Sequence, residues 1–323
     1  MPRDGRSRPV AYLTRRHTDA VEAAFAEHFD VSVNVGDVPR GQPELIRAMD
    51  HCDVMVPIVG DPFDELLFHH APYRATLIAN IGVGFNHIDL SAAARAGIAV
   101  TNTPDVLTDD TADIAIALIL MATRRLGEGE RLVRANRWHG LAPTHHLGHT
   151  LRGRTLGIVG YGRIGRAVAD RARAFGLTVR WTGRAGGHTP PDDEMAPSLD
   201  ALLETSDIVT LHAPATPDTQ HLMNVERLAR MKPGSILINT ARGSLVDERA
   251  LADSLRAGHL FAAGLDVHEH EPKITSALMG MENVVLLPHL GSATEETRTA
   301  MGLRALENAL QWLAGKPPRD RVI

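Results

Sequence analysis

A glycine-rich turn near the middle of the chain constrains the fold more than any other feature. The apolar run Leu156-Gly-Ile-Val159 enters Gly160-Tyr-Gly162-Arg-Ile-Gly165, and an amphipathic segment follows over residues 167–175. In such a strand–turn–helix, the first glycine permits a tight turn, the second lets backbone N–H groups approach a pyrophosphate, and the third allows close helix packing. This context predicts a dinucleotide-binding unit; the alternative is a turn that binds no ligand.

Short apolar runs alternate with amphipathic segments along the whole chain, which indicates strand–helix–strand units with parallel sheets. Six runs in the second half have the spacing of a complete dinucleotide fold: 155–159, 178–181, 208–211, 235–239, 262–266 and 284–287. An earlier series, 31–35, 54–59, 76–81 and 98–101, has helical segments at 19–28 and 90–96. We expect an α/β protein with two doubly wound, Rossmann-like domains, the first flavodoxin-like and the second dinucleotide-binding.

Domain boundaries follow from length and from two further helices. A chain of 323 residues exceeds one ordinary hydrophobic core. The apolar stretch 114–122, with helix-capping residues before it, predicts a buried helix that is too short for a membrane span of about 20 residues. A C-terminal helix over residues 294–313 could pack back on the first domain. We expect a discontinuous substrate-binding domain (1–101 and 292–323), a dinucleotide-binding domain (102–291) and an interdomain cleft.

Charge and cysteine content favour small-molecule chemistry. The net charge of −5 gives no electrostatic reason to expect binding to nucleic acid or to an anionic membrane surface. The single cysteine, Cys52, cannot form an intrachain disulfide and has no C-x-x-C partner, which suits a reducing compartment. The N-terminus lacks the long apolar run of a signal peptide. These features predict a cytoplasmic protein.

The strand after the glycine turn bears on cofactor choice. An NAD-selective fold places an acidic residue about 20 residues beyond the first glycine. Here no carboxylate occurs between Asp170 and Asp192, and the strand ends in Arg180-Trp-Thr-Gly-Arg184. A guanidinium and a hydroxyl suit a 2′-phosphate, so NADPH is predicted over NADH, which would be used less efficiently. The alternative is that Arg184 is a solvated loop arginine.

Three ionisable residues follow later strands of the second series: Arg242, Glu271 and His289. Ligands of open α/β sheets collect outside the carboxyl ends of the strands, where these residues are expected. Singly, each has a structural explanation as a surface charge, a polar loop residue or a histidine in a capped turn. Together they indicate a catalytic site.

The chain resembles the D-isomer-specific 2-hydroxyacid dehydrogenase family over nearly its whole length. The resemblance is to the glyoxylate/hydroxypyruvate reductase branch in particular. The resemblance places Arg242, Glu271 and His289 on the family's catalytic Arg, Glu and His. The motifs that carry it, besides the glycine turn, are Ile81-Gly-Val-Gly-Phe-Asn-His-Ile-Asp89, Thr103-Pro-Asp-Val-Leu-Thr-Asp-Asp-Thr-Ala112, Leu211-His-Ala-Pro214, Asn239-Thr-Ala-Arg-Gly243, Gly264-Leu-Asp-Val267 and Pro288-His-Leu-Gly-Ser-Ala-Thr294.

The resemblance implies that hydride passes from NADPH to the carbonyl carbon of a small 2-keto acid, which yields the D-2-hydroxy acid. His289, as imidazolium, would be the general acid that protonates the developing alkoxide, and Glu271 would hydrogen-bond the other ring nitrogen. Arg242 would bind the substrate carboxylate and polarise the carbonyl.

Further positions are assigned by the same resemblance. Substrate contacts are expected from the backbone N–H groups of Val83 and Gly84 and from Arg242, His289 and Ser292. The expected cofactor contacts are Thr111, Gly160, Tyr161, Gly162, Arg163, Ile164, Gly165, Thr182, Gly183, Arg184, His212, Ala213, Pro214, Thr219, Thr240, Ala241, Arg242, Asp266, His289 and Gly291.

The resemblance also implies a homodimer, with the region around residues 144–149 in a dimer arm. Trp138 could pack across that interface or within its own chain. The nearby histidines His145, His146 and His149 lack the H-E-x-x-H pattern and an adjacent carboxylate or cysteine, so we expect a loop role and no metal.

Two departures from the family pattern stand out. Ala185-Gly-Gly187 follows Arg184, where some relatives carry a second basic residue, and position 268 is His where Phe or Tyr is common. Alternative functions are a dehydrogenase of the same family that acts on a bulkier 2-keto acid or on phosphite, and a non-catalytic NAD(P)-sensing protein. Formate dehydrogenases of the family carry Gln where Glu271 stands, which argues against formate.

Overall fold

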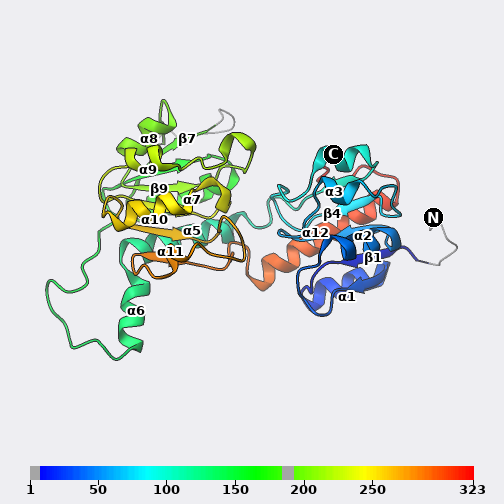
Figure 1. Ribbon diagram of the computed structural model, residues 1–323, viewed down its shortest axis with the longest axis horizontal. Helices are drawn as coiled ribbons and strands as arrows, with labels where there is room; N and C mark the ends of the chain where they lie inside the picture. Colours follow the sequence, from blue (N-terminus) through cyan, green and yellow to red (C-terminus); the bar gives the residue numbers. More distant parts are fainter. Residues whose placement is uncertain (1–7, 184–192) are drawn as a thin grey trace. The chain divides into compact units, whose positions relative to one another are not determined.

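The computed structural model describes residues 8–183 and 193–323, which form two compact units (Figure 1). The first unit comprises Met1–Leu107 and Ala293–Ile323, and the second comprises Thr108–Ser292. We expected the chain to leave the first domain after residue 101 and to return to it after residue 291; in the structure these boundaries follow Leu107 and Ser292. Each unit holds one wholly parallel sheet, which confirms the predicted pair of doubly wound α/β domains.

The sheet of the first unit has the order β2-β1-β3-β4-β5, the strand order of flavodoxin-like folds. The four predicted runs form strands, but β1, an interior strand between β2 and β3, was not predicted. Its four residues, Val10-Ala-Tyr-Leu13, lie between two arginine-containing polar segments, so the run is too short to read as a strand by itself. The strands are β1 (Val10–Leu13), β2 (Asp30–Val33), β3 (Val54–Val56), β4 (Leu77–Ala79) and β5 (Ala99–Thr101).

Five helices accompany this sheet, and the last of them comes from the far end of the chain. Helix α12 packs against α1 and β4. Gly302 allows its close approach to α1, because a Cβ atom at this position would lie 2.4 Å from Val21. Trp312 of α12 also donates a hydrogen bond to Thr76 (3.0 Å). The helices are α1 (Asp19–His28), α2 (Gln42–His51), α3 (Glu65–Phe68), α4 (Leu90–Arg95) and α12 (Glu295–Leu313).

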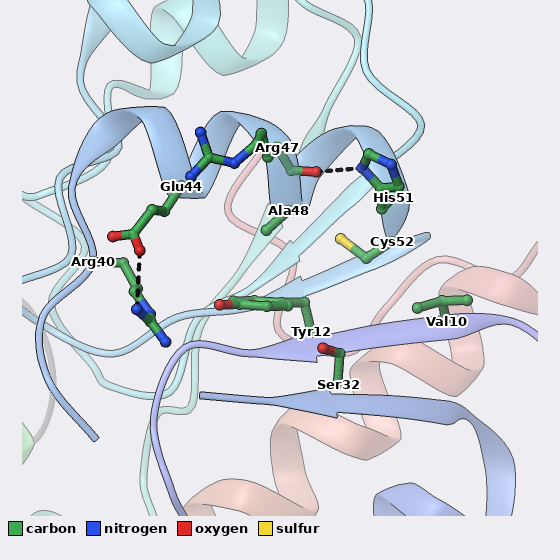
Figure 2. Close-up of a pocket in the computed structure, with 9 residues that line it drawn as sticks. All are labelled: Val10, Tyr12, Ser32, Arg40, Glu44, Arg47, Ala48, His51 and Cys52. Carbon is green, nitrogen blue, oxygen red and sulfur yellow. Dashed lines mark hydrogen bonds and ion pairs between the residues drawn. The ribbon is translucent and has the colours of Figure 1, made fainter. Parts of the chain in front are cut away.

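A surface pocket of about 310 Å³ lies between α2 and the strands β1 and β2 (Figure 2). Its lining includes Tyr12, Ser32, Arg47 and Arg40, which is paired with Glu44. None of the residues predicted to bind substrate or cofactor lines this pocket.

The sheet of the second unit has the order β12-β11-β10-β9-β6-β7-β8. The six predicted strands are confirmed to within a residue or two, and β8 is an additional two-residue strand. The chain order reverses between β6 and its neighbours β7 and β9, so the predicted glycine turn stands at a topological switch point, the usual ligand site of such sheets. The strands are β6 (Thr155–Val159), β7 (Thr178–Thr182), β8 (Glu194–Met195), β9 (Ile208–Leu211), β10 (Ile236–Asn239), β11 (Ala262–Leu265) and β12 (Val284–Leu286).

Helix α5 (Thr108–Thr123) is the predicted buried helix, and it packs on α7, β10 and β11. None of the helices in the described ranges combines the length and the apolar character that a membrane span requires. The other helical segments of this unit are α6 (Leu126–Arg134), α7 (Arg163–Ala174), α8 (Leu199–Thr205), η1 (Pro217–Thr219), α9 (Val225–Arg230), η2 (Gly243–Leu245), α10 (Glu248–Arg256) and α11 (Ser276–Met279).

Helix α6 and the segment that follows it project from the second unit (Figure 1). The helix has no fully buried side chain, and Trp138 in the following segment is 55% exposed. Exposed apolar side chains lie both on α6, at Leu126 and Val133, and in the projecting segment that follows it, at Leu141 and Leu147.

Candidate active site

His289 follows strand β12 in a strained turn. Its φ angle of +57° lies in the left-handed region, which costs a non-glycine residue about 1 kcal/mol or more. Asp266, directly after β11, holds this turn: its carbonyl accepts the His289 N–H (2.9 Å), and its carboxylate accepts those of Leu290 (2.7 Å) and Gly291 (2.8 Å). Three hydrogen bonds thus fix the backbone that presents the imidazole.

Glu271 and His289 form the hydrogen-bonded pair that the sequence predicted. The Nδ1 atom of His289 lies 2.9 Å from Oε2 of Glu271, and both side chains are about one-third exposed. The other carboxylate oxygen accepts the backbone N–H of His268 (2.9 Å). Burial raises the pKa of Glu271, but the hydrogen bond and charge of His289 together with the His268 N–H outweigh it, so the pKa lies below its usual range. The glutamate is therefore ionised and orients the ring.

Arg242 lies in the turn after β10, and Asn239 shapes that turn. The side-chain amide of Asn239 donates to the Arg242 carbonyl (2.8 Å) and accepts the Ala241 N–H (3.0 Å). Burial lowers the pKa of Arg242, while the negative charge of Glu271 raises it. The next residue, Gly243, lies directly against the backbone of His268. A Cβ atom at Gly243 would lie only 1.9 Å from the His268 carbonyl carbon. The structure thus brings the turn of Arg242 against the segment of Glu271.

The three glycines of the predicted turn are needed for different reasons. Gly160 has a φ of +93°, and a Cβ atom there would lie 2.7 Å from the backbone of His212 and Ala213. A Cβ atom at Gly165 would lie 2.3 Å from the Gly160 carbonyl oxygen. Gly162 has no neighbouring atom within 4 Å of such a Cβ and caps the N-terminus of α7. Chain packing therefore explains Gly160 and Gly165, whereas the space beside Gly162 suits a ligand phosphate.

Most of the other predicted cofactor residues line the carboxyl ends of the same strands. Tyr161 stacks on Trp181 (4.7 Å between ring centroids) and donates a hydrogen bond to Asp193, so only its backbone remains for a cofactor. Arg163 and Ile164 begin α7, Thr182 ends β7, and Gly183 directly follows it. Arg184 lies outside the described residues.

The loop after β9 closes over the glycine turn. His212 hydrogen-bonds Thr210 (3.0 Å), and burial lowers the pKa of His212 to about 3, so its ring is neutral. Thr219 in η1 donates to the carbonyl of Pro214 (2.8 Å), which anchors this loop. Ala213 lies against Gly160, as described above.

Two threonines complete the predicted nicotinamide end of the site. Thr111 of α5 donates to the Gly291 carbonyl (2.9 Å), and the Thr240 hydroxyl is buried without a hydrogen-bond partner among the residues that the structure describes. Ser292, predicted to contact substrate, is partly exposed at the end of the unit. The open position at Gly162, the N-terminus of α7 and the unpartnered Thr240 hydroxyl fit a bound dinucleotide.

In the first unit, the loop after β4 carries Val83 and Gly84. Asn102 donates to the Val83 carbonyl (2.9 Å), and Asn80 donates to the Gly84 carbonyl (3.1 Å). The N–H groups of Val83 and Gly84 have no hydrogen-bond partner within residues 8–183 and 193–323. Two amides that share a fixed loop and lack chain partners are suited to bind an anion.

The histidines of the 144–149 segment do not converge. His146 hydrogen-bonds the Arg125 carbonyl (2.9 Å), while His149 packs on the ring of Phe261 (4.3 Å between centroids). Across the described parts of the chain, no group of three or more His, Cys, Asp or Glu side chains is arranged to hold a metal ion.

Sequence reasoning missed Asn239, Gly243 and Glu248. Asn239 ends β10 and begins the motif Asn239-Thr-Ala-Arg-Gly243, but nothing in that motif indicated that its amide shapes the Arg242 turn. Gly243 closes the same motif, and only the fold shows that the His268 backbone lies against it. Glu248 is buried at the start of α10, and its carboxylate accepts the Glu269 N–H (3.0 Å) in the segment of Glu271. It carried no signal in the sequence, since an acidic residue in a helix's first turn is common.

Comparisons with known proteins agree with this geometry. The family described as D-isomer specific 2-hydroxyacid dehydrogenase, NAD binding domain, matches residues 116–291. A glyoxylate reductase from Korarchaeum cryptofilum is 40% identical over 98% of this chain and 96% of its own. An NADPH-dependent glyoxylate/hydroxypyruvate reductase from Sinorhizobium meliloti, solved with NADP and malonate, is 35% identical, with a TM-score of 0.87 over 98% of this chain and 97% of its own. A glyoxylate reductase from Paecilomyes thermophila is 33% identical, with a TM-score of 0.86 over 98% of this chain and 99% of its own.

The open position at Gly162 generates a prediction. Gly162→Ala retains the thermal unfolding midpoint, because its backbone is extended (φ −78°, ψ −159°) and nothing occupies the space of a Cβ atom. We expect its dissociation constant for NADP(H), measured by fluorescence titration, to rise at least about 10-fold, which is about 1.4 kcal/mol.

Two variants control this experiment. Gly165→Ala should lower the unfolding midpoint because of its clash with Gly160, and Gly280→Ala, also in open space, should change neither quantity. Unchanged affinity in Gly162→Ala would show that no phosphate lies beside this residue.

Proposed function

The chain belongs to the D-isomer-specific 2-hydroxyacid dehydrogenase family, and we propose that it is an NADPH-preferring reductase of glyoxylate or hydroxypyruvate. The family and the relatives named above make it a 2-keto acid reductase. The observation that supports the proposed chemistry is the hydrogen bond between His289 and Glu271, beside the turn of Arg242. This arrangement has an oriented proton donor and a cation for a carboxylate substrate.

The reaction adds a hydride and a proton across the keto group. NADPH, when bound, supplies the hydride to the carbonyl carbon. Glu271 holds Nδ1 of His289, which leaves Nε2 to carry the proton that the developing alkoxide receives. The ionised Glu271 fixes the direction of the ring by its hydrogen bond to Nδ1. The product is the D-2-hydroxy acid.

Substrate recognition is assigned to a cation and to backbone N–H donors. Arg242 binds the carboxylate and polarises the carbonyl, since a fixed cation stabilises negative charge that grows in the transition state. The backbone N–H groups of Val83 and Gly84, which have no hydrogen-bond partner among the described residues, are proposed as further substrate contacts from the first unit. Ser292 remains a proposed substrate contact.

The preference for NADPH rests on the end of β7. Thr182 ends this strand, and Gly183 and Arg184 follow it in the sequence, so the acidic residue that binds an unmodified ribose is missing. The Sinorhizobium meliloti relative is an NADPH-dependent enzyme solved with NADP, which supports the same choice here.

The decisive experiment follows NADPH oxidation with glyoxylate and with hydroxypyruvate. Wild-type protein should turn over at least one of them, and His289→Asn should lower kcat by about 10²-fold or more because the general acid is lost. His145→Asn, an exposed histidine in a loop, is the matched control and should retain activity.

The other outcomes separate the alternatives. Turnover of only larger keto acids or of phosphite would replace the proposed substrates. Binding of NADPH without any turnover would indicate a cofactor-sensing protein.

Cofactor preference is tested at Arg184. Arg184→Asp should reverse the ratio of kcat/KM for NADPH over NADH, since the new carboxylate repels a 2′-phosphate and accepts ribose hydroxyls. Arg184→Lys keeps the charge and should keep the preference, with a smaller ratio because the bidentate fork is lost. If Arg184→Asp leaves the NADPH/NADH ratio of kcat/KM unaltered, this arginine does not determine the cofactor preference.

A homodimer is the proposed assembly, formed through α6 and the projecting segment. Exposed apolar side chains gathered on an element that has no fully buried side chain are typical of a subunit interface. Trp138→Ser should shift the protein toward monomer in sedimentation velocity. Leu66→Ser, an equally exposed apolar residue in the first unit, is the control and should leave the assembly unchanged. A wild-type protein that sediments as a monomer would overturn this assignment.

A further inference from the structure

His268 is a buried histidine that the mechanism above does not use. It lies between β11 and Glu271 and is 6% exposed. Its Nε2 atom lies 2.9 Å from the carbonyl oxygen of Leu287, and its Nδ1 atom lies 3.7 Å from Oε1 of Glu248 at the start of α10. Both ring nitrogens therefore face oxygen atoms that can only accept hydrogen bonds or attract positive charge.

The surroundings of Glu248 keep it ionised. This residue is 1% exposed, and its carboxylate accepts the N–H groups of Glu269 (3.0 Å) and Thr275 (3.3 Å). Burial raises the pKa of Glu248, but His268 and these donors together lower it to about 2. A buried carboxylate of this kind requires a positive partner, and the ring of His268 faces it at ion-pair distance.

The same contacts favour the charged form of the His268 ring. Burial lowers its pKa, but the Glu248 carboxylate and the Leu287 carbonyl raise it, and the net direction is upward. The charged groups that face the ring are Glu248 from α10 and Glu271 from its own segment, and both are acidic. A neutral ring that donates from Nε2 to Leu287 would turn the lone pair of Nδ1 toward a carboxylate, whereas the imidazolium presents N–H groups on both sides.

His268 contacts all three strand ends of the catalytic site. Its backbone N–H donates to Oε1 of Glu271, the residue that holds His289. Leu287, which the ring binds, lies two residues before His289. On the side of β10, Gly243, the neighbour of Arg242, packs on the His268 backbone. One side chain thus joins α10 and the end of β12 to the segment that carries Glu271.

We propose that His268 is a positioning residue whose imidazolium ring, held between Glu248 and the Leu287 carbonyl, fixes the carboxylate of Glu271 against His289. This proposal rests on the proposed function, because it assigns a role in the reaction that Glu271 and His289 perform. The ring acts through Glu271 and does not touch the reacting atoms.

The first test reads the protonation of the ring without any turnover. In ¹⁵N-histidine-labelled, full-length protein, the His268 signals are identified by their loss in His268→Phe. We expect the wild-type ring to keep protons on both nitrogens up to a higher pH than the ring in Glu248→Gln. A wild-type ring that becomes neutral at the same pH as in Glu248→Gln, or at a lower one, would overturn the proposal.

The second test separates positioning from a general structural role. His268→Phe fills the same space without the donors and should lower kcat about 10-fold, the usual effect of losing a partner behind a reacting group. The KM for NADPH should be unchanged. In a Glu271→Gln background, His268→Phe should lower kcat by less than about 2-fold, because the group through which it acts is already altered. An equal loss in both backgrounds would show a structural role alone and overturn the proposal.

Two controls complete the design. Glu248→Gln removes the charge that faces the His268 ring but keeps the volume of the buried side chain. It should reproduce the kinetic effect of His268→Phe, and it therefore serves as the test if His268→Phe proves to be unstable. His270→Phe alters an exposed histidine of the same segment and should retain wild-type kcat. Absence of turnover in the wild type would overturn the proposed function, while the protonation measurement would still decide whether the His268–Glu248 pair exists.

Discussion

The register between β10, β11 and β12 is the constraint on which the catalytic site depends. Asn239 pairs with Leu265, and Leu265 pairs with Leu286, so the three strands end at the same level. Residues that follow them by a few positions must therefore meet at one edge of the sheet, although they are far apart in the sequence. Arg242, Glu271 and His289 owe their proximity to this ladder of backbone hydrogen bonds.

Buried polar side chains then refine the positions that the ladder sets. Asp266 ties the turn of His289, Asn239 ties the turn of Arg242, and Glu248 ties the segment beyond β11. Each of these groups satisfies backbone N–H or C=O groups that the strand ends leave unpaired. The site is thus rigid at the backbone before any ligand is bound, as preorganised electrostatic catalysis requires.

Most of the fold was predictable, because buried parallel strands appear in the sequence as short apolar runs and helices as segments whose apolar residues recur with the helical period. This logic found six strands of the second unit and missed β1, an interior strand of the first unit whose four residues leave too little pattern. The paired Glu271 and His289 were predictable from their place after strands and from the family resemblance. The left-handed turn at His289 and the roles of Asn239 and Glu248 were not, because they depend on contacts between distant segments that no local pattern encodes. Arg184 lies outside the described residues, so its predicted contact remains a prediction.

The packing of α12 on α1 and β4 has a consequence for how the protein is made. Residues 108–292 form a contiguous unit and have all their sequence available once that stretch has left the ribosome. The first unit begins earlier in the chain but waits for α12, which is synthesised after residues 108–292. Domains generally fold as units during synthesis, so the second unit is complete first, and the N-terminal sheet carries an uncovered face until α12 has been made.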